Sequence, residues 1–452
     1  GFVKILGFGT YDVRSHPRVG VLFEGLRERG FFVREVDEPL NIGTAQRVKA
    51  LSSPASAARF AAAVVKRWGR LIRRRAAYRG RNAPDAVLVG YLGHFDVLLA
   101  RVLFPSTPIV LDHLIFASDT AKDRGLLGHG LSERFKSRLL KAIDGAALAA
   151  ADVVVLDTAD HRALLPTAAR GKEVIVPVGA PARWFDAGKK REEAESRGIE
   201  NSFVQCGAEE PVSARAGADE VSAGCESASA PDLPLSAVFF GLFTPLQGAP
   251  VIARALALLE NRGTRIDVTL IGDGQDAQAV RETLPAGECV RVSWMDWVNS
   301  ADLPGVVARH DVCLGIFGTS DKARRVVPNK VYQGLAAGCT VITSDTPPQR
   351  RVLGRGALFV EPGNAQALAD ALEELAKAPS KGPSSKDVRE SFRAARVTAP
   401  LDDILRRLRR HGAPAGSGGT RGAGSRGGEP SVSRGSEPSV GQRTRLGVSR
   451  RR

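Results

Sequence analysis

The chain has 452 residues, 43% of them hydrophobic and 25% charged, with a net charge of +15. This length suits two domains, and the composition is that of a soluble globular protein. No apolar run approaches the roughly 20 residues of a membrane-spanning helix, which argues against an integral membrane protein. We expect no signal peptide, because no basic segment precedes an apolar core. The five cysteines lack metal-ligand spacing and favour a reduced, cytoplasmic protein.

The positive charge is unevenly distributed. Residues 412–452 hold eight Arg and two Glu, so this stretch supplies +6 and the rest of the chain +9. Gly, Ser, Arg and Pro dominate the stretch without periodicity, so we predict a disordered tail with no specific nucleic-acid binding. The basic remainder suits phosphate-bearing ligands or an anionic membrane face.

The first half of the chain predicts a doubly wound α/β sheet. A strand at 3–8 leads into a loop with Gly9, an amphipathic helix spans 18–29, and a second strand spans 31–36. Further short apolar strands are predicted at 86–90, 108–111, 151–156 and 173–176. Residues 1–180 are therefore expected to form one Rossmann-like domain.

A helix predicted at 56–80 has two contrasting faces. Its apolar positions are Phe60, Val64, Val65, Trp68, Leu71 and Ile72, and its basic positions are Lys66, Arg67, Arg70, Arg73, Arg74 and Arg75. One interpretation is a surface helix that packs on the sheet. The other is a helix that contacts an anionic membrane surface.

Two histidines follow predicted strands. His94 comes after the strand at 86–90, and His113 comes directly after the strand at 108–111. Ligands of open α/β sheets bind outside the carboxyl ends of the strands, so both side chains are expected to face a cleft. A structural role is the alternative for each, and His113 is the stronger functional candidate.

The middle of the chain separates two domains. Residues 177–185 predict a linker, and residues 187–233 are charged and then rich in Ala, Ser, Gly and Glu, with few large apolar side chains. Such a composition buries too little apolar surface to fold, so we assign 181–234 to a linker and a disordered insertion.

A second α/β domain is predicted at 235–378, followed by helices at 379–411. Its strands are expected at 236–240, 266–271, 290–293, 311–316 and 356–360, and a helix capped by Asn364 follows them. Glycines occupy the loops after the first two strands, at Gly241, Gly248, Gly272 and Gly274. They are expected to let backbone N–H groups approach a ligand, with the helix after Gly248 directed at a diphosphate.

The stretch from Pro328 to Asp345 is the most informative. It predicts a helix that begins with Pro328 at the first helical position and ends before Gly338, followed by a buried strand at 340–343. Asn329, Lys330 and Gln333 place polar groups on the side of this helix that faces the preceding loop.

This stretch resembles the signature region of retaining, nucleotide-sugar-dependent glycosyltransferases of family 4, which have the GT-B fold. That region carries a Glu, seven residues and a second Glu; here Arg325 and Gln333 occupy the two positions. The loop at 241–248 is similar to the family's Gly-Arg-Leu-x-Pro-x-Lys-Gly loop, with Leu242 and Gln247 in place of its two cations. The resemblance covers residues 3–185 and 235–410.

The resemblance implies how the two domains divide the work. Residues 1–180 would bind the acceptor, with His113 beside the transferred sugar as the catalytic candidate. Residues 235–378 would bind most of the donor, with Lys322, Arg324, Arg325 and Lys330 replacing the missing cations. The implied donor-binding residues are Gly9, Gly241, Thr244, Gly248, Gly272, Gly274, Asp296, Trp297, Arg325, Asn329, Lys330 and Gln333.

The implied reaction is hexosyl transfer from a nucleoside diphosphate sugar, with retention and with the leaving phosphate as base. No metal and no cofactor besides the donor are expected. The acceptor would be a glycan, a lipid-linked sugar or a small molecule, and the protein cytoplasmic or peripheral on the inner membrane face. The alternative is a catalytically inactive GT-B protein that acts as a binding or scaffold subunit, as the residues at 242, 247, 325 and 333 suggest. A GT-B epimerase is a third hypothesis, without identifiable acidic residues to support it.

Overall fold

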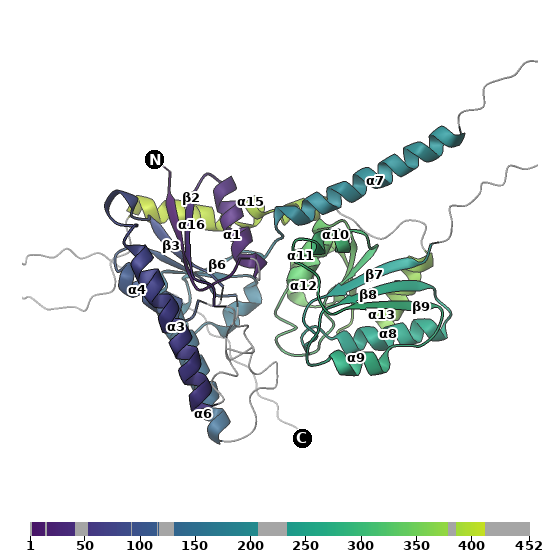
Figure 1. Cartoon of the computed structure of the whole chain (residues 1–452), viewed down its shortest axis with the longest axis horizontal. Coiled ribbons are helices and arrows are strands. Elements are labelled where there is room, and N and C mark those ends of the chain that lie inside the picture. The colour runs from purple at the N-terminus through teal and green to yellow at the C-terminus, as the bar shows by residue number, and fades with distance from the viewer. Residues whose placement is uncertain are drawn as a thin grey trace, which may run out of the picture. The chain divides into compact units, whose positions relative to one another are not determined.

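The computed structural model describes residues 2–13, 16–40, 53–91, 93–114, 116, 131–206, 233–377 and 386–411. Two six-stranded sheets, all of whose strand pairs are parallel, organise these residues (Figure 1). We call residues 2–180 the N-terminal half and residues 233–377 the C-terminal half. The predicted α/β class with two doubly wound sheets is confirmed.

The N-terminal sheet has the strand order β2-β1-β3-β4-β5-β6. Its central strands are buried on both faces, as the continuous apolar runs at 86–89 and 109–111 require of a parallel sheet. The strands are β1 Lys4–Gly9, β2 Phe32–Asp37, β3 Ala86–Val89, β4 Ile109–Asp112, β5 Val153–Leu156 and β6 Glu173–Ile175.

Helices cover both faces of this sheet. The helix α1 (Pro17–Glu28) lies on one face, and α3 (Pro54–Arg75), α4 (Asp96–Leu103) and α6 (Leu131–Ala150) lie on the other (Figure 1). The short 3-10 helices are η2 Gly80–Asn82, η3 Ala159–Leu164 and η4 Thr167–Ala169.

The orientation of α3 differs from the predicted one. Trp68 and Leu71 pack on the sheet as expected, but Val65 and Ile72 are exposed. Arg67 and Arg75 instead turn toward the protein, where they donate to the carbonyls of Pro39 and Leu103. The long aliphatic stems of arginine allow this, because the guanidinium can reach a carbonyl while the stem packs.

The predicted insertion begins later than expected. Residues 187–197 are not disordered but belong to α7 (Ala182–Cys206). This helix packs on the C-terminal half, where Arg191 donates to the carbonyl of His310. Such polar contacts hold the helix in place, and a prediction based on the number of large apolar residues does not detect them. The rest of the expected insertion, residues 207–232, lies outside the described residues.

The C-terminal sheet has the order β12-β11-β10-β7-β8-β9. Its strands are β7 Leu235–Phe240, β8 Ile266–Ile271, β9 Val290–Met295, β10 Val312–Leu314, β11 Thr340–Ser344 and β12 Ala357–Val360. Its helices are α8 Ala249–Asn261, α9 Ala277–Thr283, α10 Leu303–Ala308, α11 Asn329–Ala336, α12 Pro347–Leu353, η5 Gly354–Gly356 and α13 Ala365–Lys377.

The helix α11 begins one residue later than predicted. Pro328 has extended backbone angles and is the N-cap rather than the first helical residue. The end is as expected: Gly338 has φ +84°, and the N–H groups of Gly338 and Cys339 donate to the carbonyls of Leu335 and Gly334. These two bonds make a Schellman cap, which directs the chain straight into β11.

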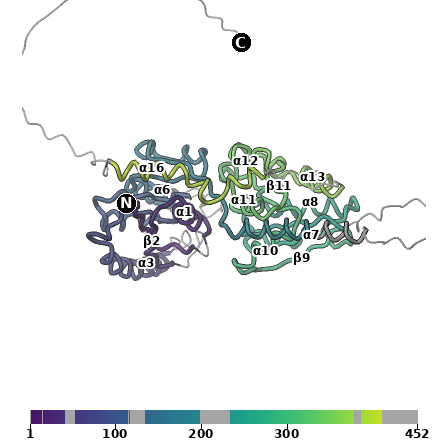
Figure 2. The backbone as a smooth tube through the Cα atoms, turned by 90° about the horizontal axis from the view of Figure 1, so that it is seen from above, coloured from purple at the N-terminus to yellow at the C-terminus, as the bar shows by residue number. Residues whose placement is uncertain are grey.

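The chain returns to the N-terminal half at its C-terminal end. The helices there are α14 Lys386–Ser391, α15 Ala394–Val397 and α16 Ala399–His411. Leu401 and Leu405 of α16 join the core beneath α1, and the tube of α16 runs along the N-terminal half in Figure 2. None of the helices in the described part of the chain has the length and apolar character needed to cross a bilayer.

Candidate functional site

A cavity of about 460 Å³ lies at the carboxyl ends of the strands of the C-terminal half. Of the predicted site residues, Gly241, Thr244, Asn329, Lys330 and Gln333 line it, as do Leu242, Gln247 and Lys322. The N-terminal half contributes Pro17, Tyr91, Leu114 and Asp157. The predicted residues that do not line this cavity are Gly9, His113, Gly248, Gly272, Gly274, Asp296, Trp297 and Arg325.

Glycine is required in the loops for a different reason from the one predicted. A Cβ atom on Gly272 would lie 2.0 Å from the carbonyl oxygen of Gly241, and one on Gly248 would lie 2.4 Å from the backbone nitrogen of Gly318. Both residues have positive φ angles, +125° and +67°. The glycines therefore let neighbouring loops pack backbone against backbone, which fixes the wall of the cavity.

Gly241 has a separate role beside Lys330. A Cβ atom on Gly241 would contact the Lys330 side chain, 3.5 Å from its Nζ atom. The absence of a side chain there leaves space next to the ammonium group on the cavity side.

Lys330 is the most unusual group in the cavity wall. Its side chain is buried, and its Nζ atom has no hydrogen-bond partner in the structure. The ammonium lies 3.6 Å from the ring centroid of Phe239, whose π face attracts a cation. Burial lowers the pKa of Lys330 to about 7. A buried ammonium without an anionic partner is costly, so this position is suited to an anion that enters the cavity.

The charge of the cavity wall supports the same conclusion. In the C-terminal half, Lys322 and Lys330 line the cavity and no Asp or Glu does. The side-chain oxygen of Gln247 is buried at the same wall without a hydrogen-bond partner. Lys330 can thus bind an anion, while the Gln247 oxygen at the same wall accepts a hydrogen bond from a hydroxyl or amide of the same ligand.

Asp296 and Trp297 lie at the edge of the loops. Trp297 is 75% exposed, and Asp296 forms an exposed ion pair with Arg281. The aromatic residue of β9, Trp294, stacks on Phe243, and its indole N–H donates to the carbonyl of Gly272. Trp294 braces the glycine loop, which the sequence did not indicate.

The two residues at the family's Glu positions are placed differently. Gln333 is buried and lines the cavity, whereas the side chain of Arg325 is not part of the cavity wall. The backbone carbonyl of Arg325 instead accepts a hydrogen bond from Thr158 of the N-terminal half, at 2.8 Å.

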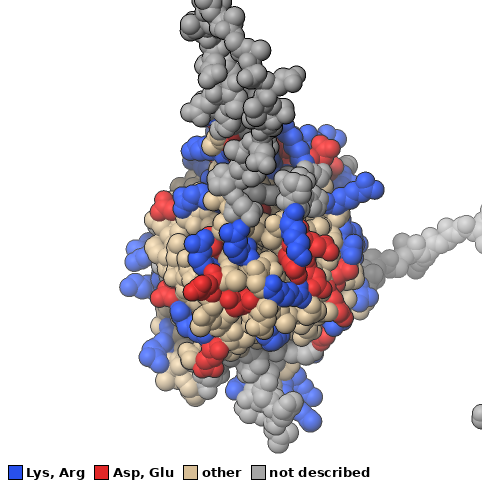
Figure 3. All heavy atoms as spheres, turned by 90° about the vertical axis from the view of Figure 1, so that its right-hand side faces the viewer, with Lys and Arg blue, Asp and Glu red and all other residues tan. Residues whose placement is uncertain are grey.

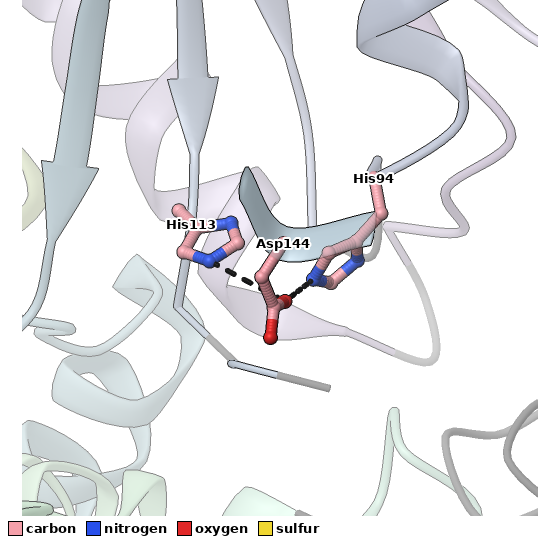
Figure 4. Close-up of side chains that lie close together, drawn as sticks. All are labelled: His94, His113 and Asp144. Atoms are coloured by element: carbon pink, nitrogen blue, oxygen red, sulfur yellow. Dashed lines mark ion pairs between the residues drawn. The ribbon is translucent and has the colours of Figure 1, made fainter. Parts of the chain in front are cut away.

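His113 belongs to a buried cluster with His94 and Asp144. Figure 4 shows the two imidazoles on either side of the Asp144 carboxylate. His94 Nε2 lies 3.2 Å from Asp144 Oδ1, whereas His113 Nε2 lies 3.8 Å away and has no hydrogen-bond partner. Burial, followed by the proximity of His94, lowers the pKa of His113 to about 3, so the imidazole is neutral at physiological pH.

The same three side chains have the donor atoms of a metal site. One ligand atom from each of the three residues lies within 4.8 Å of the other two, so the three could hold a single metal ion. Two imidazoles and one carboxylate are ligands suited to Zn²⁺. The cluster can therefore either present a neutral imidazole to a ligand or hold a cation.

Sequence reasoning missed a buried ion pair next to this cluster. The Arg18 Nε atom lies 3.3 Å from both carboxylate oxygens of Asp112, and Arg18 also donates to the carbonyl of Pro177 at 2.7 Å. Burial raises the pKa of the Asp112 carboxyl, an effect that Arg18 opposes. The pair fixes the end of β4, and with it the backbone that carries His113.

Two further carboxylates in the N-terminal half were also missed. Asp96 accepts hydrogen bonds from the backbone and hydroxyl of Thr10, both at 2.7 Å, and from the Trp68 indole at 2.9 Å. Asp157 lies 2.6 Å from His161 and lines the cavity. The partners of Asp96 come from distant parts of the sequence, whereas Asp157 and His161 are only four residues apart, a spacing that the sequence did offer.

Comparisons with known proteins agree with this geometry. Residues 234–378 match the profile of the family described as glycosyl transferases group 1. No curated protein matches the sequence.

Solved structures share the fold across nearly their whole length. The chain is similar to sucrose-phosphate synthase from Thermosynechococcus elongatus, with a TM-score of 0.57, 14% identity, and 90% of this chain and 99% of that chain covered. An α,α-trehalose-phosphate synthase from Burkholderia xenovorans, in complex with glucose-6-phosphate, gives a TM-score of 0.56 at 13% identity, with 90% and 100% covered. Anabaena HepE in complex with UDP gives 0.52 at 12% identity, with 90% and 100% covered.

At these identities the solved structures establish the fold alone, and the family match is confined to the C-terminal half. The described chain has the GT-B fold, and residues 234–378 match the family described as glycosyl transferases group 1.

Proposed function

We propose that this protein is a retaining hexosyltransferase that uses a nucleoside diphosphate sugar and requires no metal for transfer. The C-terminal half binds the diphosphate, and the N-terminal half binds the acceptor. The family match supports glycosyl transfer, and the fold relatives in complex with UDP and with glucose-6-phosphate support a nucleotide donor and a sugar acceptor.

Lys330 is the observation that carries this proposal. Its buried ammonium faces a cavity whose C-terminal wall has no carboxylate, and Gly241 leaves space beside it. A diphosphate would provide the missing anionic partner through a charge-assisted hydrogen bond. Lys322 adds a second positive charge at the same wall, and it partly replaces the cations absent at Leu242 and Gln247.

The remaining site residues take roles around this anchor. Gln333 and Asn329 offer hydrogen bonds to donor hydroxyls from the first two turns of α11, and Thr244 offers a hydroxyl from the glycine loop. Gly248 and the glycines at 272 and 274 shape the loops. We assign His113 the role of a neutral hydrogen-bonding group for the transferred sugar, although its buried side chain does not line the cavity. The leaving phosphate takes the acceptor proton. Gly9, Asp296, Trp297 and Arg325 would reach the donor only through loop movement.

The test compares Lys330→Met with the parent in calorimetric titrations with uridine and guanosine diphosphates and their sugars. Met keeps the length of the side chain without its charge. We expect affinity for the responding diphosphate to fall about 100-fold, from loss of a charge-assisted bond worth roughly 2–3 kcal/mol, while nucleoside affinity hardly changes.

Arg324 was among the cations expected to replace the missing pair, but the structure leaves it exposed and outside the cavity wall, so Arg324→Met is the matched control. It should leave diphosphate affinity within about twofold of the parent. The proposal fails if the parent binds none of these nucleotides, or if both variants lose affinity equally.

A second candidate function is a binding subunit without catalysis. It is favoured by Arg325 and Gln333, which stand where the family has two carboxylates. Tight binding of a donor sugar without its turnover or hydrolysis in the presence of a broad acceptor panel would support this candidate.

A further inference from the structure

We propose that the outer face of α3, α4 and α6 docks on the surface of an anionic lipid bilayer. Docking does not depend on the transferase activity. If the transferase proposal also holds, docking would bring the acceptor-binding half to lipid-linked acceptors.

The three helices form one continuous surface. All three contribute to the core beneath one face of the N-terminal sheet, α3 packs against α4, and α4 packs against α6. Figure 1 shows them together on the side of the sheet opposite α1 and α16.

This surface exposes more large apolar side chains than packing on the sheet requires. Val65 of α3 is 63% exposed, Val102 of α4 is 76% exposed and Phe135 of α6 is 69% exposed. Ile72, Leu98 and Leu139 are also exposed on the same helices. Adjacent exposed apolar groups on several helices mark an interaction surface rather than scattered exceptions.

The apolar positions form stripes along the helices. On α3, exposed alanines at 58, 61 and 62 continue the line of Val65 and Ile72 at helical spacing. On α6, exposed alanines at 142, 146 and 149 continue the line of Phe135 and Leu139. Apolar stripes along surface helices can enter the boundary between lipid headgroups and acyl chains.

Cations border both stripes. Arg59, Lys66 and Arg73 recur every seven residues along one side of α3, and all three are exposed. On α6, Arg134, Arg138 and Lys141 are exposed beside the apolar positions. Such long side chains can extend to lipid phosphates while the apolar stripe is immersed.

Acidic residues are few on these three helices. The acidic residues of α3, α4 and α6 are Asp96, Glu133 and Asp144, and of these Asp96 and Asp144 are buried. Elsewhere the charges are mixed: Figure 3 shows Lys and Arg interspersed with Asp and Glu on the face that it draws. In the C-terminal half, Arg262 pairs with Asp370 and Glu373. A surface of these helices with many exposed cations, exposed apolar groups and few acids is complementary to anionic lipid and would be repelled by cationic partners.

The test measures co-sedimentation of the full chain with vesicles of phosphatidylglycerol and phosphatidylcholine in equal parts, and with phosphatidylcholine alone. We expect binding to the anionic vesicles that weakens as salt is added, and little binding to the neutral ones. Absence of binding to anionic vesicles, or equal binding to both kinds, would overturn the proposal.

Two triple variants locate the surface. Arg59→Gln with Lys66→Gln and Arg73→Gln should lower binding about a hundredfold, because each cation contributes about fivefold near an anionic surface. Val65→Ser with Val102→Ser and Phe135→Ser should lower it at least about tenfold, because these side chains would no longer enter the bilayer. All six side chains are exposed, so the variants should fold like the parent.

The matched controls change the same chemistry elsewhere. They are Arg254→Gln with Arg309→Gln and Arg355→Gln, and Phe2→Ser with Leu233→Ser, all at exposed positions. The Arg-rich residues 412–452 are present in every variant, so a loss confined to the helix variants cannot come from them. Equal losses in controls and helix variants would overturn the proposal. So would a dimer in analytical ultracentrifugation that the serine triple variant dissociates, because the surface would then be a protein interface.

Discussion

The two halves treat buried charge differently. In the N-terminal half, buried ionisable groups lie beside one another: Arg18 pairs with Asp112, and His161 lies 2.6 Å from Asp157. In the C-terminal half, the buried ammonium of Lys330 has no hydrogen-bond partner. The comparison shows that one buried charge can stabilise the fold through a pair, whereas another can remain available to bind a ligand. In the sequence, both appear only as polar residues next to apolar runs.

The largest expected effect is on stability, and it would sharpen this comparison. Arg18→Met removes one partner of a buried ion pair and leaves the Asp112 carboxylate uncompensated, so we expect a loss of about 3–5 kcal/mol in the free energy of unfolding. Lys330→Met removes an unpaired buried charge and should cause no loss. Urea denaturation of both variants measures the difference. Equal destabilisation would mean that the two charges play the same structural role.

The next largest effect concerns His113. If its neutral imidazole contacts the transferred sugar, His113→Ala should lower kcat/KM about 100-fold without unfolding the protein. Because its pKa is about 3, the pH–rate profile should have no limb from His113 between pH 5 and 8.

A chelator distinguishes the two roles open to the His94, His113 and Asp144 cluster. Activity that survives dialysis against EDTA agrees with metal-independent transfer. Loss of activity on dialysis, with its recovery on adding Zn²⁺, would instead assign the cluster to a metal site.

The pH dependence of donor binding would test Lys330 more finely. Its pKa is lowered to about 7 in the folded protein, so the charged form dominates below pH 7 and is lost as pH rises through that value. Affinity for a nucleotide sugar, whose diphosphate does not titrate near pH 7, should therefore fall up to about tenfold per pH unit above pH 7. The free energy of unfolding without ligand should rise over the same range, because the unfolded state keeps the proton up to its higher pKa. A flat affinity profile in the parent would contradict this role.

The smallest expected effect is at Gln333. Gln333→Glu restores the carboxylate found at this position in the family, and an ionised acceptor binds a hydroxyl more strongly than an amide does. We expect a gain of about threefold to tenfold in donor affinity, measured by calorimetry. A glutamate that abolishes binding would show that the cavity has adapted to the neutral amide.

Local sequence patterns predicted most of the fold. The buried strands follow from continuous apolar runs, and the C-terminal end of α11 and the Asn364 cap follow from residues within one or two turns, because a cap is a local set of hydrogen bonds. Of the site residues that the resemblance implied, Gly241 and Thr244 in the loop after β7 and Asn329, Lys330 and Gln333 in α11 line the cavity, whereas the other eight do not.

Only the tertiary structure decided which polar groups have partners. The separation between Arg18 and Asp112, or between Thr10 and Asp96, spans most of a domain, so no spacing rule connects them. The side of α3 that faces outward was likewise undetermined, because long Arg side chains can reach carbonyls from positions that a binary pattern assigns to solvent. The sequence by itself determined the elements and the loops of the site. Burial and pairing, which arise only when distant segments meet, determined that the Lys330 ammonium has no hydrogen-bond partner, whereas Arg18 pairs with Asp112.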